Sequence, residues 1–420
     1  MSSSSPGRIS LNSRATQNDL SVSTNVSFMP SRRNWTIRHW HPSTIHSAIS
    51  CGCFRRDWSK RRADPVEHDL IGREYLAQGM RLQREDRGRS QLSATPEDWG
   101  LGRETMMNSN QAQRILVAGS INMDLVCRVP RLAAVGETLR GEQFQTVPGG
   151  KGANQAVAAA RLGADVSLLG AVGTDAFGTT QIDGLAQAGV DTQGVFRVPD
   201  VASGVAMIFV LPKGENSITF IQGANAGLTD AWMQSIWNKD AEYQWMLLQT
   251  ELPLSVNRKL IRSAVSHGVP VLLDAGGQPN LLTPEDLEGV SVFSPNESEL
   301  DAIVGHSCTD EDSAIRAAQG LLQYGVEAVA LKRGAQGALW VDRDRVIKEP
   351  AFTVDPVDTT ACGDAWTSGL AVALMHEMTI PYALKFANAA GALAALAEGA
   401  QPAMPYLEDV LDMMECKELL

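Results

Sequence analysis

An acidic residue stands among small residues in the segment Asp358-Thr359-Thr360-Ala361-Cys362-Gly363-Asp364. The residues that follow, 365–375, are mostly apolar or small, which predicts a buried helix that begins in this segment. The first N–H groups of a helix have no partner within it and bind anions. Those of 361–364 would hold charge on a phosphoryl group while Asp364 accepts a proton from an attacking hydroxyl. The segment therefore predicts phosphoryl transfer; a simple N-cap by Asp364 is the alternative.

A glycine-rich loop, Pro148-Gly149-Gly150-Lys151-Gly152-Ala153-Asn154-Gln155, leads into a second run of small residues. Glycines lack a Cβ and let a ligand approach the backbone closely, and the run after them predicts a helix. The loop is not a G-x-x-x-x-G-K-[ST] phosphate loop, because no Ser or Thr follows Lys151. Lys151 is expected to bind a ligand; a solvated lysine is the alternative.

Together these two regions closely resemble the signature regions of the ribokinase-like (PfkB) family of sugar kinases. The resemblance extends over about 114–415, through segments 119–124, 136–138, 149–154, 249–251, 295–299, 332–337, 358–364 and 399–402. It implies an enzyme that transfers the γ-phosphoryl group of ATP to a sugar hydroxyl. The intact Asn122-Met123-Asp124 and Gly149–Asn154 motifs favour D-ribose as the sugar, phosphorylated at its 5-hydroxyl to give D-ribose 5-phosphate and ADP.

The resemblance also implies a role for each motif. Asp364 is the implied catalytic base, and the amides of Ala361, Cys362 and Gly363 form the implied anion hole. The implied sugar contacts are Asn122, Met123, Asp124, Gly150, Lys151, Gly152, Ala153, Asn154, Glu251 and Asp364. The implied ATP contacts are Asn296, Lys332, Arg333, Gly334, Ala335, Gln336, Gly337, Gly363, Asp364 and Asn388.

Taken without the resemblance, three of these motifs have simpler interpretations. Asn122 and Asp124 fit a turn at the end of a strand. Residues 332–337 fit a hairpin turn, and Asn388 fits a packed, alanine-rich helix.

Two cation sites are expected. Asn296 and Glu299 are three residues apart, so both face one side of a helix start, where they would organise Mg²⁺ and its waters. A helix cap is an alternative that is compatible with this role. The resemblance further implies an activating K⁺ held by Asp358, Thr360, Ala394, Ala397, Gly399 and Ala403.

The chain departs from the family pattern at two positions. Ala403 stands where the family often has serine, so one hydroxyl ligand is missing and K⁺ activation is expected to be weaker or completed by water. Cys362 stands where the family usually has Ala or Gly, which puts a thiol beside the phosphate path. Alkylation of this thiol is expected to inactivate the enzyme.

Short apolar runs that alternate with longer helical runs predict an α/β fold with a parallel sheet covered by helices. Strands are expected at 115–118, 166–170, 245–249, 270–274, 290–294 and 328–332, and helices at 154–162, 254–267 and 311–324. Polar and apolar residues alternate in 125–147 and 204–221, which predicts antiparallel strands. The resemblance implies a ribokinase-like three-layer α/β/α fold in which these strands form a small lid over the sugar. It also implies a homodimer that packs lid against lid.

Composition excludes several classes of protein. The 420-residue chain is 44% hydrophobic, has no apolar run long enough to span a membrane, and carries scattered cysteines, as expected in the reducing cytoplasm. Residues 107–420, the expected kinase domain, carry a net charge of −17, which argues against a nucleic-acid partner.

Residues 1–106 differ from the rest, with a net charge of +5, a serine run and Lys60 as their only lysine. We expect little stable structure there beyond a helix near 67–84. The extension is an organelle-targeting segment, a basic tail that binds an anionic partner, or sequence upstream of a true start at Met106 or Met107. The ordinary domain size of the remainder favours the last of these.

Two other functions stay open. A related kinase acting on deoxyribose, another sugar or a nucleoside would share the anion hole and differ around Asn122, Asp124 and Lys151. A non-catalytic sugar or nucleotide sensor would be expected to have lost the acidic residue that this chain retains as Asp364.

Overall fold

The computed structural model describes residues 113–212, 215–238 and 242–416. The chain divides into two units, residues 1–57 and 58–420, and every described residue lies in the second. The extension expected at 1–106, with its helix near 67–84, lies outside the described residues.

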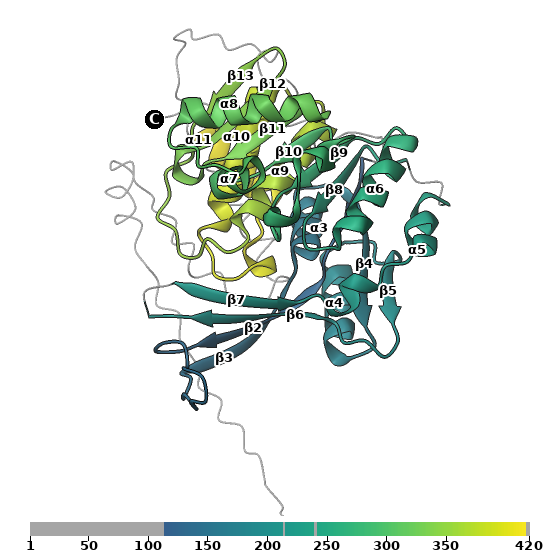
Figure 1. Ribbon diagram of the computed structural model, residues 1–420, viewed down its shortest axis with the longest axis vertical. Coiled ribbons are helices and arrows are strands. Elements are labelled where there is room, and N and C mark those ends of the chain that lie inside the picture. Colours follow the sequence, from purple (N-terminus) through teal and green to yellow (C-terminus); the bar gives the residue numbers. More distant parts are fainter. Residues whose placement is uncertain (1–112, 213–214, 239–241, 417–420) are drawn as a thin grey trace, which may run out of the picture. The chain divides into compact units, whose positions relative to one another are not determined.

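A nine-stranded sheet forms the centre of this unit, in the order β13-β12-β11-β10-β9-β8-β1-β4-β5 (Figure 1). The strands are β1 (Arg114–Ala118), β4 (Asp165–Gly173), β5 (Val195–Val198), β8 (Trp245–Gln249), β9 (Val271–Asp274), β10 (Val292–Ser294), β11 (Ala328–Lys332), β12 (Ala338–Asp342) and β13 (Val346–Glu349). Neighbouring strands from β11 to β5 are parallel, which confirms the predicted parallel sheet. Only the β11–β12 and β12–β13 pairs within it are antiparallel. Sequence analysis did not predict β5, β12 or β13.

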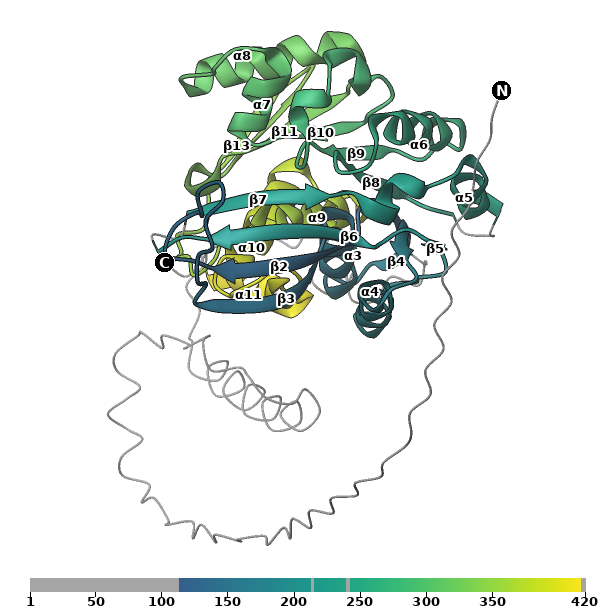
Figure 2. The ribbon, with the colours of Figure 1, turned by 60° about the horizontal axis from the view of Figure 1, so that its bottom comes forward.

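Helices cover both faces of this sheet (Figures 1 and 2). Alternate residues of β1 point to opposite faces: Ile115 and Val117 join one buried apolar cluster, and Leu116 and Ala118 join the other. The first cluster includes α3 (Lys151–Arg161), α4 (Ala176–Gln187), α9 (Cys362–Met375), α10 (Ile380–Ala394) and α11 (Leu407–Cys416). The second includes α5 (Asp230–Ser235), α6 (Leu254–Ser266), α7 (Glu297–Val304) and α8 (Glu311–Leu321). Among the helices of the described ranges, none is long and apolar enough to cross a membrane.

A second sheet forms the predicted lid, with strand order β3-β2-β6-β7. Its strands are β2 (Asn122–Arg128), β3 (Gln143–Gly149), β6 (Gly204–Val210) and β7 (Asn216–Ile221). The β2–β3 and β6–β7 pairs are antiparallel, but the central β2–β6 pair is parallel, so the prediction of purely antiparallel strands was wrong there. The reason is the long connection through α3, β4, α4 and β5, which returns the chain to the lid in the direction of β2. In the view of Figure 2 the four strands of this sheet lie side by side, in front of α9, α10 and α11.

The lid joins the main sheet through a tight backbone contact between the end of β1 and the start of α3. A Cβ added to Gly152 would lie 2.5 Å from the carbonyl carbon of Gly119, and one added to Gly150 would lie 2.6 Å from the nitrogen of Asn122. Gly150 also has a φ of +92°, which disfavours other residues. These glycines therefore serve close packing of the chain against itself, a reason that the sequence interpretation of the loop did not include.

Replacing Gly152 by Ala is expected to lower the free energy of unfolding by about 1–3 kcal/mol, because the methyl group would have to displace backbone. Urea unfolding of the two proteins measures this. The matched control is Gly320→Ala in α8, where an added Cβ meets nothing within 4 Å. There the helix should gain about 0.5–1 kcal/mol. Equal effects at the two glycines would contradict the packing argument.

Candidate active site

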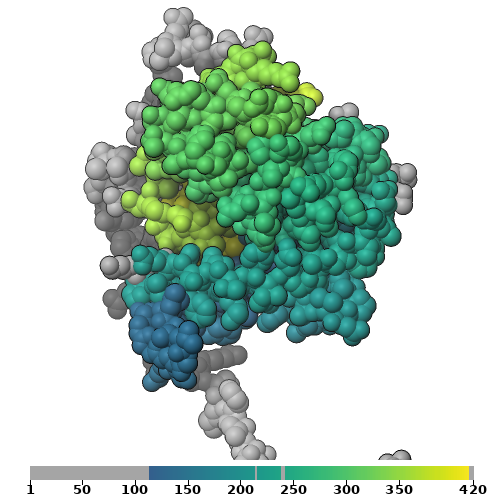
Figure 3. Space-filling view, viewed as in Figure 1, coloured from purple at the N-terminus to yellow at the C-terminus, as the bar shows by residue number. Residues whose placement is uncertain are grey.

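The carboxyl ends of the parallel strands and the lid meet where polar side chains gather. Ser120 follows β1, Glu251 follows β8, Asp274 ends β9 and Lys332 ends β11, while β2 contributes Asn122. Figure 3 shows the lid, with its dark-blue strands, projecting from the rest of the unit. Segments far apart in the sequence thus supply one site.

Asp364 lies at the N-terminus of α9, as predicted. Its side chain is 2% exposed and accepts hydrogen bonds from Asn154 Nδ2 at 2.9 Å and Gln155 Nε2 at 3.2 Å. Lys151 Nζ lies 3.6 Å from Asp364 Oδ1, and this carboxylate raises the pKa of the lysine. Asp364 is therefore held by the two partners expected for the sugar, Lys151 and Asn154, and it does not cap the helix.

The helix start itself is shaped by Ala361, whose φ of +60° places it in the left-handed region. No side chain caps α9 there, and the Cys362 amide donates to the Thr359 carbonyl at 3.3 Å. Burial, with Asp358 and Asp364 nearby, raises the pKa of the Cys362 thiol to about 11. A thiol with this pKa is almost wholly protonated at neutral pH and reacts slowly with alkylating agents, which weakens the expectation of inactivation through Cys362.

The predicted sugar residues come together at the base of the lid. Asn122 accepts a hydrogen bond from Asn225 Nδ2 at 2.8 Å and donates to Glu251 Oε2 at 3.4 Å. Glu251 Oε2 also accepts from the Lys151 amide at 3.2 Å and from the Ser120 hydroxyl. Asn122 and Asp124 open the strand β2, so the interpretation as a strand-end turn was wrong.

Successive side chains of β2 point to opposite faces of the lid. Met123, 3% exposed, points to the face opposite Asp124, so its side chain is directed away from Asp124. The backbones of Gly150, Gly152 and Ala153 line the start of α3 beside Ser120, whose carbonyl accepts from the Ala153 amide at 3.0 Å. The Gly152 amide also lies 3.5 Å from the Ser120 hydroxyl, so these backbones pack on the end of β1.

Acidic groups crowd the sugar side of the site. Burial, together with Glu251 and Asp364, raises the pKa of Asp124 to about 7. Burial likewise raises the pKa of Glu251, although Lys151 opposes this. A carboxyl group whose pKa is about 7, such as that of Asp124, can donate as well as accept hydrogen bonds at neutral pH, which suits a ligand with several hydroxyls.

On the expected ATP side, 332–337 form a hairpin between β11 and β12, with a tight turn at Gly334–Gln336. A Cβ on Gly337 would lie 2.0 Å from the Glu349 carbonyl oxygen, so this glycine is needed for packing. The Arg333 guanidinium is 8% exposed and pairs with Glu297 at 3.3 Å and Glu311 at 2.5 Å. The turn backbone, including Ala335, and not the Arg333 side chain is therefore open to a nucleotide.

Asn388 is almost fully buried in α10. Its Oδ1 accepts from Trp366 Nε1 at 2.7 Å, and its Nδ2 donates to the carbonyls of Glu349 and Pro350 at 3.2 and 3.1 Å. These bonds engage its donors and its acceptor in tying α9 and the end of β13 together. That Asn388 lies beside the adenine of ATP stays a prediction. Such a contact would be one of packing, because the hydrogen-bonding groups of this side chain are engaged within the protein.

Asn296 and Glu299 form a reciprocal cap at the start of α7. Asn296 Oδ1 accepts from the Glu299 amide, and Glu299 Oε2 accepts from the Asn296 amide, both at 2.8 Å. Burial raises the pKa of Glu299. The cap is thus confirmed, and the second oxygen of Glu299 is the atom that fits a water-shelled Mg²⁺. Within the described part of the chain, no three His, Cys, Asp or Glu side chains gather as a metal cluster.

The segments expected around K⁺ are brought together by Asp358. Its Oδ1 accepts from the Thr360 amide at 2.8 Å and its Oδ2 from the Gly399 amide at 2.9 Å. These bonds lower the pKa of Asp358 in spite of burial. Ala394 and Ala403 are buried beside this loop, and Ala397 donates its amide to the Ala394 carbonyl at 3.4 Å. Both oxygens of Asp358 thus bind backbone amides, and these bonds bring the segments around Thr360 and Gly399 together.

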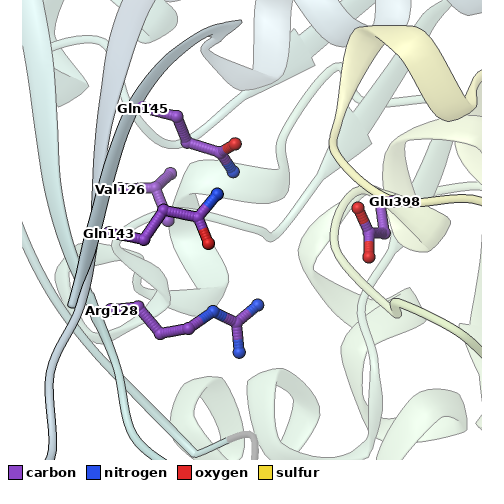
Figure 4. Close-up of a pocket in the computed structure, with 5 residues that line it drawn as sticks. All are labelled: Val126, Arg128, Gln143, Gln145 and Glu398. Carbon is purple, nitrogen blue, oxygen red and sulfur yellow. The ribbon is translucent and has the colours of Figure 1, made fainter.

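A small pocket of about 240 Å³ opens between this loop and the lid (Figure 4). Val126, Arg128, Gln143 and Gln145 line it from β2 and β3, and Glu398 faces them from the loop. The lid and the loop are therefore separate surfaces here, with polar side chains on both sides.

Sequence analysis missed a group of buried residues that connects the motifs. Asp274, 1% exposed, accepts from Lys332 Nζ at 2.8 Å and Gln155 Nε2 at 2.9 Å. Gln155 thus donates to both Asp274 and Asp364, and its Oε1 accepts from Gln249 Nε2 at 2.7 Å. The available signal was the position of Asp274 as the last residue of an expected strand, since ligands of parallel sheets bind there.

Comparison with known proteins agrees with this geometry. Residues 112–407 match the model of the pfkB family of carbohydrate kinases. The chain belongs to this family. It is 38% identical to the ribokinase of Haemophilus influenzae over 304 residues, which cover 72% of this chain and 98% of the relative. It is 36% identical to the deoxyribokinase of Salmonella typhi over 65% of this chain and 89% of the relative. The structure of Arabidopsis thaliana ribokinase complexed with ribose and ATP superposes with a TM-score of 0.68 at 31% identity, over 73% of this chain and 99% of that one.

Membership in the pfkB family establishes the chain as a carbohydrate kinase, a phosphotransferase, with the ribokinase-like fold that the sequence predicted. The matched range begins at residue 112 and ends at residue 407. Within this fold Asp364 meets Asn154 although 210 positions separate them in the sequence.

The raised pKa of Asp124 predicts a pH-dependent effect on stability. A carboxyl group with a folded-state pKa of about 7, against 3.8 when unfolded, binds its proton more tightly in the folded protein. The fold therefore loses stability as pH rises from about 4 to about 7. Asp124→Asn removes this loss, so its stability relative to the unmodified chain should increase between pH 5 and pH 8. Urea unfolding at several pH values measures the difference; a difference that does not change with pH would rule out the raised pKa.

Proposed function

We propose that this carbohydrate kinase phosphorylates D-ribose at its 5-hydroxyl, with ATP as donor and with D-ribose 5-phosphate and ADP as products. The observation that carries the proposal is the placement of Asp364, buried at the N-terminus of α9 and held by Lys151 and Asn154. The ribokinase relatives and the complex of the plant ribokinase with ribose and ATP support the choice of sugar.

The residues divide the work as follows. Asn122, Asp124, Lys151, Asn154 and Glu251 hold the sugar hydroxyls. Asp364 accepts the proton of the 5-hydroxyl as its oxygen forms a bond to the γ-phosphorus and the bond from that phosphorus to ADP breaks. The amides at Ala361, Cys362 and Gly363 stabilise the charge on the transferring oxygens. The lid over the sugar excludes water, which would otherwise accept the phosphoryl group.

We assign the nucleotide to the end of the sheet formed by β10 and β11. The turn Gly334–Gln336 offers backbone groups there, and Asn296 and Glu299 stand at the adjacent start of α7. Mg²⁺ would be held by Glu299 and by the phosphates, with waters completing its shell, and would neutralise phosphate charge when bound. K⁺ would occupy the loop beside Asp358 and raise activity by stabilising the anion hole, with Ala403 giving a weaker site than serine.

A second candidate is the same transfer to deoxyribose. The deoxyribokinase relative favours it, because its identity to this chain is only two percentage points below that of the Haemophilus ribokinase. The two sugars differ by one hydroxyl. The preference between them therefore depends on whether Asn122 and Glu251 form hydrogen bonds with that hydroxyl. A sugar sensor without catalysis is disfavoured by the retained Asp364.

We place the enzyme in the cytoplasm as a homodimer. Cys127, Cys308 and Cys362 are free thiols, as a reducing compartment allows. The lid face opposite Asp124 carries exposed apolar side chains, with Phe144 63%, Ile221 50% and Met207 40% exposed. A cluster of this kind is typical of an interface, and a second copy of the lid is the partner that we propose.

Turnover by the full chain tests the proposed reaction. ADP release with Mg-ATP should be fastest with ribose among ribose, deoxyribose, fructose and adenosine, and it should increase when K⁺ replaces Na⁺. Asp364→Asn should lower kcat by about 10²–10⁴-fold, because a positioned base contributes this much, and should still bind ribose. Faster turnover of deoxyribose would replace the substrate, and ribose binding without turnover by the unmodified chain would favour a sensor.

Oligomeric state tests the proposed dimer. Phe144→Asp puts a charge on the apolar lid face, so the particle mass by light scattering should fall from that of two chains to that of one. Val265→Asp is the control, because Val265 is 54% exposed on α6, outside the lid. A monomeric parent chain, or a dimer in the Phe144→Asp variant, would exclude the lid interface.

A further inference from the structure

Lys332 ends β11 and turns its side chain into the protein, away from the hairpin that follows it. Its Nζ donates to Asp274 Oδ1 at 2.8 Å and lies 3.5 Å from Thr367 Oγ1. The side chains are 11% and 1% exposed for Lys332 and Asp274, so the pair is almost fully buried. This lysine therefore occupies a fixed place under the site instead of reaching into solvent from the turn.

That place is beside the anion hole. Lys332 Nζ stands 3.9 Å from the point where a Cβ on Gly363 would lie, and Thr367 is one turn further along α9. The ammonium group thus approaches the first turn of the helix from the side of the main sheet. A phosphoryl group held by the Gly363 amide would come next to this positive charge.

Four hydrogen bonds fix the carboxylate of Asp274 in place. Oδ1 accepts from Lys332 and from the Gly276 amide at 2.9 Å, and Oδ2 accepts from Gln155 at 2.9 Å and Thr367 at 3.1 Å. Each oxygen is bonded to donors on different elements, so the carboxylate is fixed between α3, α9 and β11. A fixed carboxylate fixes the ammonium group bonded to it.

A buried ion pair is not an efficient way to stabilise a fold, because the loss of hydration offsets most of the attraction. Apolar side chains of similar size would fill the same space at least as well. The retention of two charges under the anion hole therefore points to a use of the positive charge that packing alone does not require.

We propose that Lys332 is a catalytic residue, whose ammonium group donates a hydrogen bond to the transferring phosphoryl group, and that Asp274 is the positioning residue that aims it. This inference rests on the proposed sugar kinase reaction and adds a cation to its anion hole. Lys332 gives up no proton in the step. Its charge offsets the negative charge on the phosphoryl oxygens while the bond to the sugar oxygen forms and the bond to ADP breaks.

The two neighbouring cations, Lys151 and Arg333, lie farther from Gly363 than Lys332 does. Lys151 Nζ lies 3.6 Å from Asp364 Oδ1, on the side of the expected sugar residues. The Arg333 guanidinium pairs with Glu297 and Glu311. Of these three cations, Lys332 is the one whose charged group lies nearest to Gly363.

Kinetics of the full chain with Lys332→Gln test the proposal. The variant should lose about 10²–10³-fold in kcat, the loss seen when one donor to a developing anion is removed, while the KM for ribose stays within about threefold. Lys259→Gln is the matched control, because Lys259 forms an exposed pair with Asp230 at 2.6 Å and should keep full activity. An unchanged kcat in Lys332→Gln would overturn the proposal.

A neutral pair separates catalysis from packing. Lys332→Gln with Asp274→Asn removes both charges together, so no unpaired charge is buried and the protein should fold even where a single variant does not. If Lys332 contacts the phosphoryl group, kcat of the double variant stays as low as that of Lys332→Gln. If Lys332 only neutralises Asp274, the double variant recovers activity and the proposal fails.

Binding supplies a readout that does not need turnover. Mg-ADP with aluminium fluoride and ribose mimics the transferring phosphoryl group, and Lys332→Gln should weaken this complex about 10²-fold while binding Mg-ADP alone nearly as well as the unmodified chain. Equal weakening of both would assign Lys332 to nucleotide binding and overturn the proposal. An unmodified chain that phosphorylates no sugar would refute the proposed function itself, which is a different outcome.

Discussion

The structure depends on the burial of opposite charges at the carboxyl ends of its parallel strands. Asp274 and Asp364 are 1% and 2% exposed, and Lys332 and Lys151 lie 2.8 and 3.6 Å from them. Burial alone raises the pKa of Asp274, but the ammonium groups of Lys332 and Lys151 lower it below its ordinary value. Each charge is tolerable only beside its partner, so the strands and helices that carry them have to meet in one arrangement.

This constraint links the fold to the proposed chemistry. Gln155, on α3, donates to the carboxylates of both Asp274 and Asp364, which joins the glycine-rich segment to β9 and α9. The glycines at 150 and 152 let α3 approach the end of β1 closely enough for this contact. The same residues that position the base therefore join α3 to β9 and to α9.

Local patterns allowed much of this to be predicted. The apolar run after Gly363 predicted the helix α9, and the alternation of strands and helices predicted the parallel sheet. Asp274 was not predicted as a site residue, because a single acid at a strand end has no local signature. Its place in the site follows from its hydrogen bonds with Lys332 and Gln155, which are distant in sequence. The parallel β2–β6 pair was missed for a similar reason, since strand pairing is decided by a long connection rather than by the strands. For Asn388 and Arg333 the sequence motifs predicted contacts with ATP. In the structure their side chains instead bond to other residues of the protein.

The site's contacts join residues that leave the ribosome far apart in time. The bond between Asn154 and Asp364 spans 210 positions, and that between Gln155 and Asp274 spans 119. Strands β1, β4 and β8 can receive part of α3 early, but the side of α3 that packs on α9 lacks its partner until α9 has been synthesised. A nascent chain therefore leaves this side of α3 uncovered until Cys362–Met375 has been translated, and uncovered apolar surface favours aggregation.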